Sequence, residues 1–165
     1  MEPVVRCGLI AGAISSEVMV LLVLVNTILI RNYFSQPSLT GGGLLSFWNI
    51  MYPLFVILIF EMGGIFSARI CRKNIVPGKD AFITGFITGI TTGIILEIMW
   101  FSQIVSLVAH TGNSWSGTTS GLGSIVMLII ALLLILVIMG GVLSAFGSYI
   151  YATRTAQESR ASSDA

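Results

Sequence analysis

Four long, nearly uninterrupted apolar stretches run through this chain, at about residues 7–30, 46–70, 81–108 and 122–152. Each is long enough for an α-helix to cross the roughly 30 Å of hydrocarbon in a bilayer, which takes about 20 residues. The first stretch is also longer than the apolar core of a secretory signal, about 7–15 residues. The pattern therefore predicts an all-α membrane protein with four transmembrane helices in contact with the lipid bilayer.

An internal repeat relates the two halves of the chain. The segment Met-Gly-Gly-Ile-Phe-Ser-Ala at 62–68 returns at 139–145 as Met-Gly-Gly-Val-Leu-Ser-Ala, an offset of 139 − 62 = 77. The same offset lays Gly-Leu-Ile-Ala-Gly at 8–12 onto Gly-Phe-Ile-Thr-Gly at 85–89. Agreement of two separate segments on one offset indicates a tandem duplication of a two-helix hairpin. The two repeats span about residues 4–74 and 81–151.

The distribution of basic residues predicts how the helices are oriented. Seven of the eight Lys and Arg residues fall on one side of the predicted membrane, and only Arg31 falls on the other. Because cytoplasmic connections carry the excess of Lys and Arg, both termini and the 71–80 connection are expected in the cytoplasm of a multi-pass cell-membrane protein. We expect residues 1–153 to form one bundle and the polar tail 154–165 to be disordered.

Glycines are expected to bring the helices of this bundle close together. Small residues one turn apart allow two backbones to approach, which favours helix association in lipid. We expect the Gly-x-x-x-Gly faces of the first and third spans to pack against the Met-Gly-Gly faces of the second and fourth. The predicted packing residues are Gly8, Gly12, Gly63, Gly64, Gly85, Gly89, Gly93, Gly140 and Gly141.

Two carboxylates at similar depth form the candidate chemical site. At ~1.5 Å per residue, Glu17 lies roughly 16 Å beyond Arg6, and Glu61 lies roughly 12 Å before Arg69. Charged groups in hydrocarbon are costly and mark functional sites. If the first two spans are neighbours, the two acids can face one another and share a proton or bind a cation. Alternatively, a protonated Glu hydrogen-bonds to the next helix and ties the two together.

Further polar and aromatic residues lie toward the outer side. Glu97 is roughly 25 Å beyond Asp80 by the same rise, so it is expected to snorkel or to anchor an outer loop. The connections 32–45 and 110–121 are rich in turn-forming residues. Six aromatic residues are expected in an interfacial belt: Tyr33, Phe34, Phe47, Trp48, Trp100 and Trp115.

Cysteine and histidine content argues against several kinds of chemistry. Cys7 and Cys71 are both expected near the cytoplasmic face, where thiols stay reduced, so no disulfide is predicted. A single His and two Cys do not make a metal site. No catalytic arrangement or cofactor motif is present, so we expect neither an enzyme nor a cofactor. The net charge of +1 favours no nucleic-acid partner.

The region 60–93 resembles small uncharacterised four-helix membrane proteins of bacteria and archaea. The resemblance is carried by the Gly-Gly-x-x-x-Ala end of the second span, the short basic turn and the Gly-spaced third span. It implies a prokaryotic tetraspan protein and brings no activity with it. The tandem hairpins are also similar to the duplicated proteolipids of rotary ATPase rings, but the fourth span here lacks the carboxylate of those proteins.

Two functions agree with these patterns. The first is a structural or accessory subunit that packs through its glycine-rich faces with itself, as a homo-oligomer, or with a larger membrane complex. The alternative is a small transporter or channel that conducts protons or cations through Glu17 and Glu61.

Overall fold

The computed structural model describes residues 2–35, 41–72, 76, 78–111 and 119–163. Four helices, and no strand, make up this part of the chain: α1 (Glu2–Ser35), α2 (Gly41–Ile70), α3 (Lys79–Thr111) and α4 (Thr119–Ser163). Each contains a segment of at least 21 residues that is apolar enough to cross a membrane. The predicted all-α fold with four membrane helices is therefore confirmed. Within the expected connections, residues 36–40, 73–75 and 112–118 lie outside the described residues, as do the side chains of Tyr33, Phe34 and Trp115. The described parts of the two expected outer loops, at 32–35, 41–45, 110–111 and 119–121, are helical, so that prediction is wrong there.

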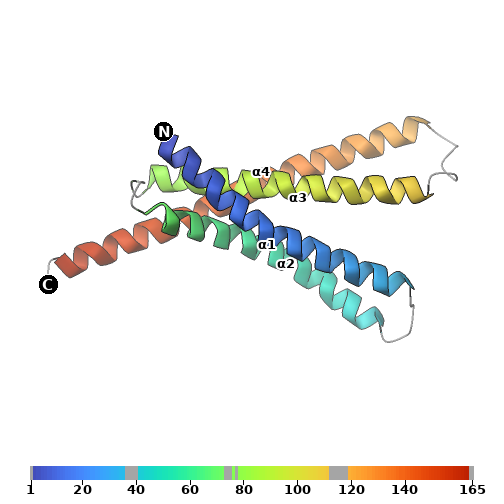
Figure 1. Ribbon diagram of the computed structural model, residues 1–165, viewed down its shortest axis with the longest axis horizontal. Coiled ribbons are helices and arrows are strands. Elements are labelled where there is room, and N and C mark those ends of the chain that lie inside the picture. The colour runs from blue at the N-terminus through green and yellow to red at the C-terminus, as the bar shows by residue number, and fades with distance from the viewer. Residues whose placement is uncertain (1, 36–40, 73–75, 77, 112–118, 164–165) are drawn as a thin grey trace.

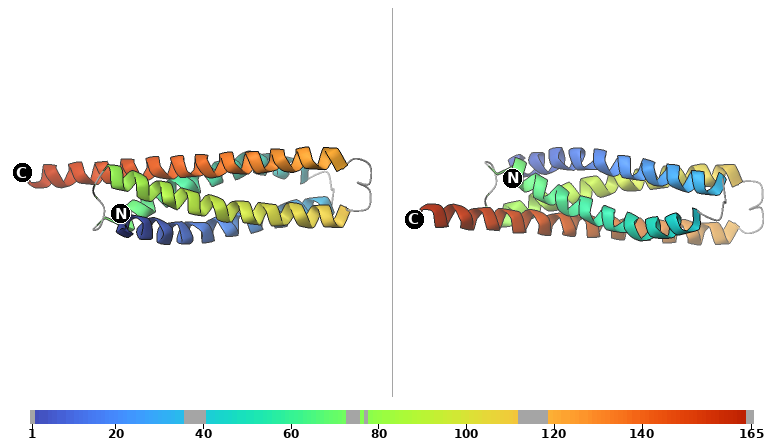
Figure 2. Two further views of the ribbon diagram at one scale, coloured as in Figure 1. Left: turned by 90° about the horizontal axis from the view of Figure 1, so that it is seen from above. Right: turned by 90° about the horizontal axis from the view of Figure 1, so that it is seen from below.

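The helices form an elongated bundle of two hairpins. The start of α1, the end of α2, the start of α3 and the end of α4 lie at one end of the bundle, while the opposite ends of the four helices lie at the other (Figure 1). The hairpins cross in the half of the bundle nearer the termini and diverge toward the far end. Seen from above and below, α4 extends past the other helices at its C-terminus (Figure 2). Within the bundle α3 contacts all three other helices, because α1 and α2 also pack against it beside its hairpin partner α4.

The surface of the bundle is that of a protein surrounded by lipid. Large apolar side chains point outward along the helices, among them Leu21 at 63% exposed, Ile50 at 62% and Ile98 at 64%. The interior instead holds small and hydroxylated residues, with Ser67, Thr84 and Thr88 fully buried. In water this distribution would be unfavourable. In a bilayer, however, burying apolar groups between helices gives little net driving force for their association. The outward face is therefore lipid-facing.

The C-terminal segment is helical, contrary to the predicted disordered tail at 154–165. Helix α4 continues to Ser163, and residues 164 and 165 lie outside the described residues. Hydroxyls in this extension bond back to the preceding turn, with Thr155 Oγ1 3.0 Å from the Tyr151 carbonyl oxygen. The extension contains no Gly or Pro, and its Ala, Gln, Glu and Arg residues are favourable in helices. Composition alone suggested disorder because it ignores continuation from an existing helix, which needs no new nucleation.

A disulfide joins the start of α1 to the end of α2, and the prediction of two free thiols is wrong for this structure. Cys7 and Cys71 are bonded, with their Cα atoms 6.1 Å apart, a separation typical of disulfides. Both residues are largely buried, at 9% and 0% exposed. The prediction of free thiols used only the expected cytoplasmic location. It did not include the contact that the hairpin makes between two residues 64 positions apart.

Candidate functional site

Glycines of α3 let the backbone of α4 approach closely. A β-carbon added at Gly89 would lie 2.7 Å from both the Gly140 carbonyl carbon and the Gly141 Cα atom. One added at Gly85 would lie 2.9 Å from the Ala145 Cα atom. Real β-carbons do not make such short contacts, so only glycine fits at these positions. A further contact between the helices is a hydrogen bond of 2.6 Å that Ser148 Oγ donates to the Ala81 carbonyl.

Gly8 and Gly12 of α1 lie against threonines of α3, and not against the Met-Gly-Gly face of the second or fourth span as we expected. A β-carbon at Gly12 would lie 2.7 Å from the Thr91 Cβ atom, and one at Gly8 would lie 2.9 Å from the Thr84 carbonyl oxygen. This approach lets Thr88 Oγ1 donate a hydrogen bond of 3.1 Å to the Gly8 carbonyl across the two helices. Thr92 Oγ1 makes the equivalent 3.3 Å bond to Gly12. The threonine face of α3 is therefore the docking surface for α1.

The other glycines face neighbours within the same chain. A β-carbon at Gly64 would lie 2.7 Å from the Ser144 carbonyl carbon, in the backbone of α4. The remaining close neighbours are Ser15 for Gly63, Val137 for Gly93, Phe60 for Gly140 and Phe86 for Gly141. All nine glycines named from the sequence thus have close neighbours inside the bundle. A partner protein would have to bind on a different surface.

The carboxylates of Glu17 and Glu61 lie on the outer surface of the bundle. Both side chains are exposed, while buried neighbours such as Ser16 and Phe60 face inward. Neither carboxylate forms a hydrogen bond or ion pair with another described residue. Glu17 is nine residues past Gly8, about two and a half helical turns, so the two positions point to opposite sides of α1. Neither carboxyl group therefore has, among the described residues, the buried hydrogen-bond partner on a neighbouring helix that would link two helices.

Glu97 is the membrane carboxylate that faces a helix neighbour. Its Oε1 atom is buried and has no hydrogen-bond partner among the described residues. The side chain lines a cavity between α3 and α4 together with Leu136. We expected this residue to snorkel or to anchor an outer loop, and the structure instead gives it a cavity within the predicted span Lys79–Gln103.

A cluster of hydrogen-bonded polar and aromatic side chains links three helices in the half of the bundle away from the termini. Trp48 Nε1 donates to Asn26 Oδ1 at 2.8 Å, which joins α2 to α1. Trp100 Nε1 donates to the Tyr52 hydroxyl at 3.3 Å, which joins α3 to α2. Gln103 Nε2 donates to a Thr27 hydroxyl of α1 at 2.6 Å. From the sequence we expected Trp48 and Trp100 in an interfacial belt, and we overlooked Asn26. An amide side chain within an apolar span was the available sign of a hydrogen bond between helices.

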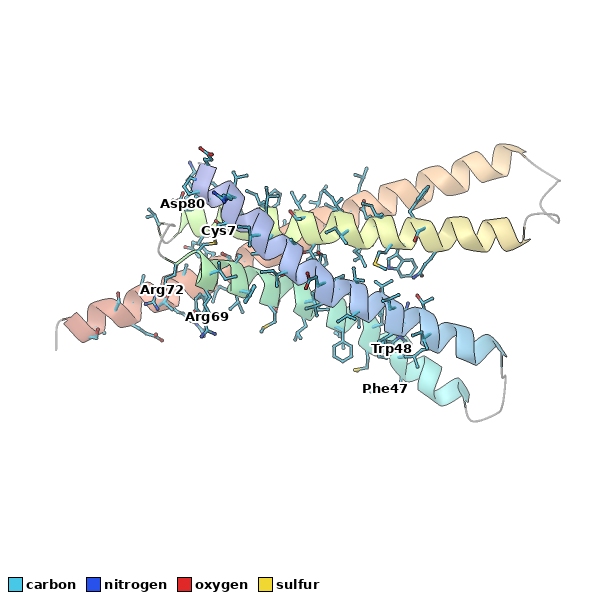
Figure 3. The ribbon with its side chains drawn as sticks, in the orientation of Figure 1. Cys7, Phe47, Trp48, Arg69, Arg72 and Asp80 are labelled. Atoms are coloured by element: carbon cyan, nitrogen blue, oxygen red, sulfur yellow. A yellow bond between two sulfur atoms is a disulfide. The ribbon has the colours of Figure 1, made fainter. Side chains whose placement is uncertain are left out.

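The end of the bundle that carries the termini is basic. Arg69 and Arg72 lie at the end of α2, beside the disulfide, while Phe47 and Trp48 lie toward the opposite end (Figure 3). A groove of about 490 Å³ opens here between α1 and α2, lined by Arg6, Cys7 and Ile70 among others. No group of three His, Cys, Asp or Glu side chains that could hold a metal occurs in the described part of the chain.

Comparison of the whole chain with protein-family models, with curated proteins and with solved structures finds no match.

Proposed function

We propose that this four-helix membrane protein is a structural or accessory subunit of a larger membrane complex. The observation that carries this proposal is the outward position of Glu17 and Glu61 within the apolar spans. Acidic residues at such depth normally face a bundle interior or a water-filled cavity, because a charge at the bilayer centre costs about 2.5–3.5 kcal/mol on insertion scales. Two such residues on the outside of a bundle are best explained by a protein that covers them.

The chain cannot easily cover these acids with a second copy of itself. Its basic residues near the membrane lie at the span ends, at Arg6, Arg69, Lys79 and Arg154, and the cores between them contain no Lys, Arg or His. A second copy therefore brings no positive charge to the depth of Glu17. A different membrane protein can bring a basic or hydrogen-bond-donating side chain to that depth, so we favour a complex over a homo-oligomer.

Conduction of protons or cations through Glu17 and Glu61 receives less support. A conducting pair needs the two carboxylates to share a hydrated path, whereas both are exposed on the outer, lipid-facing surface of the bundle. Close contacts at the glycines and threonines also pack α3 directly against both α1 and α4 in the interior of the bundle.

Site-specific photo-crosslinking in native membranes tests the proposal. In one variant a benzophenone amino acid would replace Leu21, which lies one turn beyond Glu17 on the outer face of α1. In a matched control variant the same amino acid would replace Ile138 on α4. The two positions are similarly exposed, at 63% and 57%. We expect one identified membrane protein to crosslink at position 21, and the Glu17→Leu exchange to abolish that product. Crosslinks only to lipid at both positions would contradict the proposal, and crosslinks to a second copy would replace it with self-association.

A further inference from the structure

The groove between α1 and α2 lies at the level where both helices leave the membrane. Its volume is about 490 Å³, and it is lined by Glu2, Pro3, Arg6, Cys7, Ile10 and Ile70. Glu2 is the first residue of one candidate span, and Ile70 is the last residue of another. Polar headgroups of the bilayer occupy this level, because the hydrocarbon ends there. The groove is therefore placed beside the headgroups of the surrounding lipid.

The lining of the groove changes from charged to apolar along α1. Glu2, Arg6 and Ile10 follow one another at intervals of four residues, so they share one side of the helix and are about 6 Å apart along its axis. Ile70 of α2 adds a second apolar side chain. An acidic group, a basic group and an apolar wall thus succeed one another from the start of α1 toward the membrane interior.

The two charged side chains are available to a ligand. Both Glu2 and Arg6 are exposed, and among the described residues neither has a hydrogen-bond or ion-pair partner. A guanidinium group can donate two parallel hydrogen bonds to a phosphate, and a carboxylate accepts strong hydrogen bonds from a cation. Ile10 and Ile70 are 48% and 43% exposed, so an acyl chain can lie against them.

The disulfide fixes the two walls of the groove relative to one another. Cys7 lines the groove and is bonded to Cys71, which holds the start of α1 against the end of α2. Arg6 and Ile70 each lie next to one of these cysteines in the sequence. Binding to side chains on a rigid framework costs less conformational entropy than binding to mobile segments.

A phospholipid carries its chemical groups in the same order as this groove. Its acyl chains are followed by a phosphate, and in phosphatidylethanolamine the phosphate is followed by an ammonium group. We propose that the groove binds phosphatidylethanolamine, with the phosphate at Arg6 and the ammonium group at Glu2. One acyl chain then lies against Ile10 and Ile70. A phospholipid without the ammonium group leaves Glu2 without a partner, so the groove discriminates against it.

Native mass spectrometry of the full chain in detergent tests this proposal, with phosphatidylethanolamine and phosphatidylglycerol of identical acyl chains added in equal amounts. Phosphatidylglycerol has the same phosphate and no ammonium group. We expect the wild type to bind phosphatidylethanolamine about fivefold more tightly, the upper range for an exposed ion pair, and Glu2→Gln to lose this preference. General attraction to basic residues would give the opposite preference, because it favours the anionic lipid.

Three further measurements separate the groove from other lipid contacts. Arg6→Gln should bind both lipids about fivefold more weakly, whereas Arg154→Gln, which removes an exposed arginine of α4 outside the groove, should bind as the wild type does. Ile70→Trp should weaken binding of both lipids with the two charged groups intact, because the larger side chain fills the apolar part. Soluble glycerophosphoethanolamine, which has the headgroup without acyl chains, should not displace the lipid.

Several results would overturn the proposal. If the wild type bound both lipids equally, or if the preference persisted in Glu2→Gln, Glu2 would not recognise the ammonium group. If Arg154→Gln weakened binding as much as Arg6→Gln, the arginines would act through general charge and not through the groove. Displacement of the lipid by glycerophosphoethanolamine would show that the acyl chain is not recognised.

Discussion

Replacing Gly89 by alanine should loosen the contact between α3 and α4. The added β-carbon would lie 2.7 Å from two backbone atoms of α4, the Gly140 carbonyl carbon and the Gly141 Cα atom. Carbon atoms in ordinary contact are about 3.5–4.0 Å apart, so the two helices must separate by about 1 Å. Backbone cannot rotate out of the way as a side chain can. Overpacking of this kind typically costs about 1–3 kcal/mol.

Gly93→Ala is the matched control on the same helix. Its β-carbon would lie 3.1 Å from the Val137 Cα atom and 3.3 Å from its Cγ2 atom, so a shift of a few tenths of an ångström suffices and the loss should stay below about 1 kcal/mol. Both exchanges add the same methyl group and the same helix propensity, so their difference reports packing. Unfolding by SDS in mixed micelles, followed by tryptophan fluorescence, measures it. Equal stability of the two variants would refute the proposed close approach of α3 and α4 at Gly89.

Two further predictions concern the α1 contacts. Thr88→Val removes the hydrogen bond to the Gly8 carbonyl and should lower the free energy of unfolding by about 0.6 kcal/mol, up to about 1.7. Thr91→Val removes only a bond within α3 and should lower it by less. The same SDS titration compares the two variants, and an equal loss of stability would argue against the interhelical bond. Cys7 and Cys71 should resist maleimide labelling in SDS until a reductant is added, because they are bonded to each other; labelling of both without reductant would contradict that bond.

The predicted fold class and number of spans came from hydropathy, which reports the solvent of each segment directly. Helix ends were harder to predict. The first span was expected to end at residue 30, whereas α1 runs to Ser35, and α4 runs ten residues beyond Thr153. A membrane requires a minimum helix length, but it does not prevent a helix from continuing into water.

The depth of a residue in the membrane could be calculated from the sequence. The side of the helix on which that residue lies was not taken into account. The rise per residue correctly places Glu17 within its span, but which side it faces depends on the neighbouring helices. Had the small-residue face through Gly8 and Ser15 been taken as the inward one, Glu17 would have been predicted to point outward. The Cys7–Cys71 bond and the cavity at Glu97 depend on contacts between helices, and no pattern within one helix encodes them.

If Glu17 and Glu61 bind another protein and do not stabilise the bundle, their removal should release that protein and leave the chain folded. Native mass spectrometry of the chain, extracted with its surrounding lipid, compares the wild type with the Glu17→Leu/Glu61→Leu double variant. We expect a second protein bound in fixed ratio to the wild type, and a folded chain without that protein in the variant. A wild-type chain that emerges without another protein, or a variant that keeps its partner, would show that these two residues do not bind a partner.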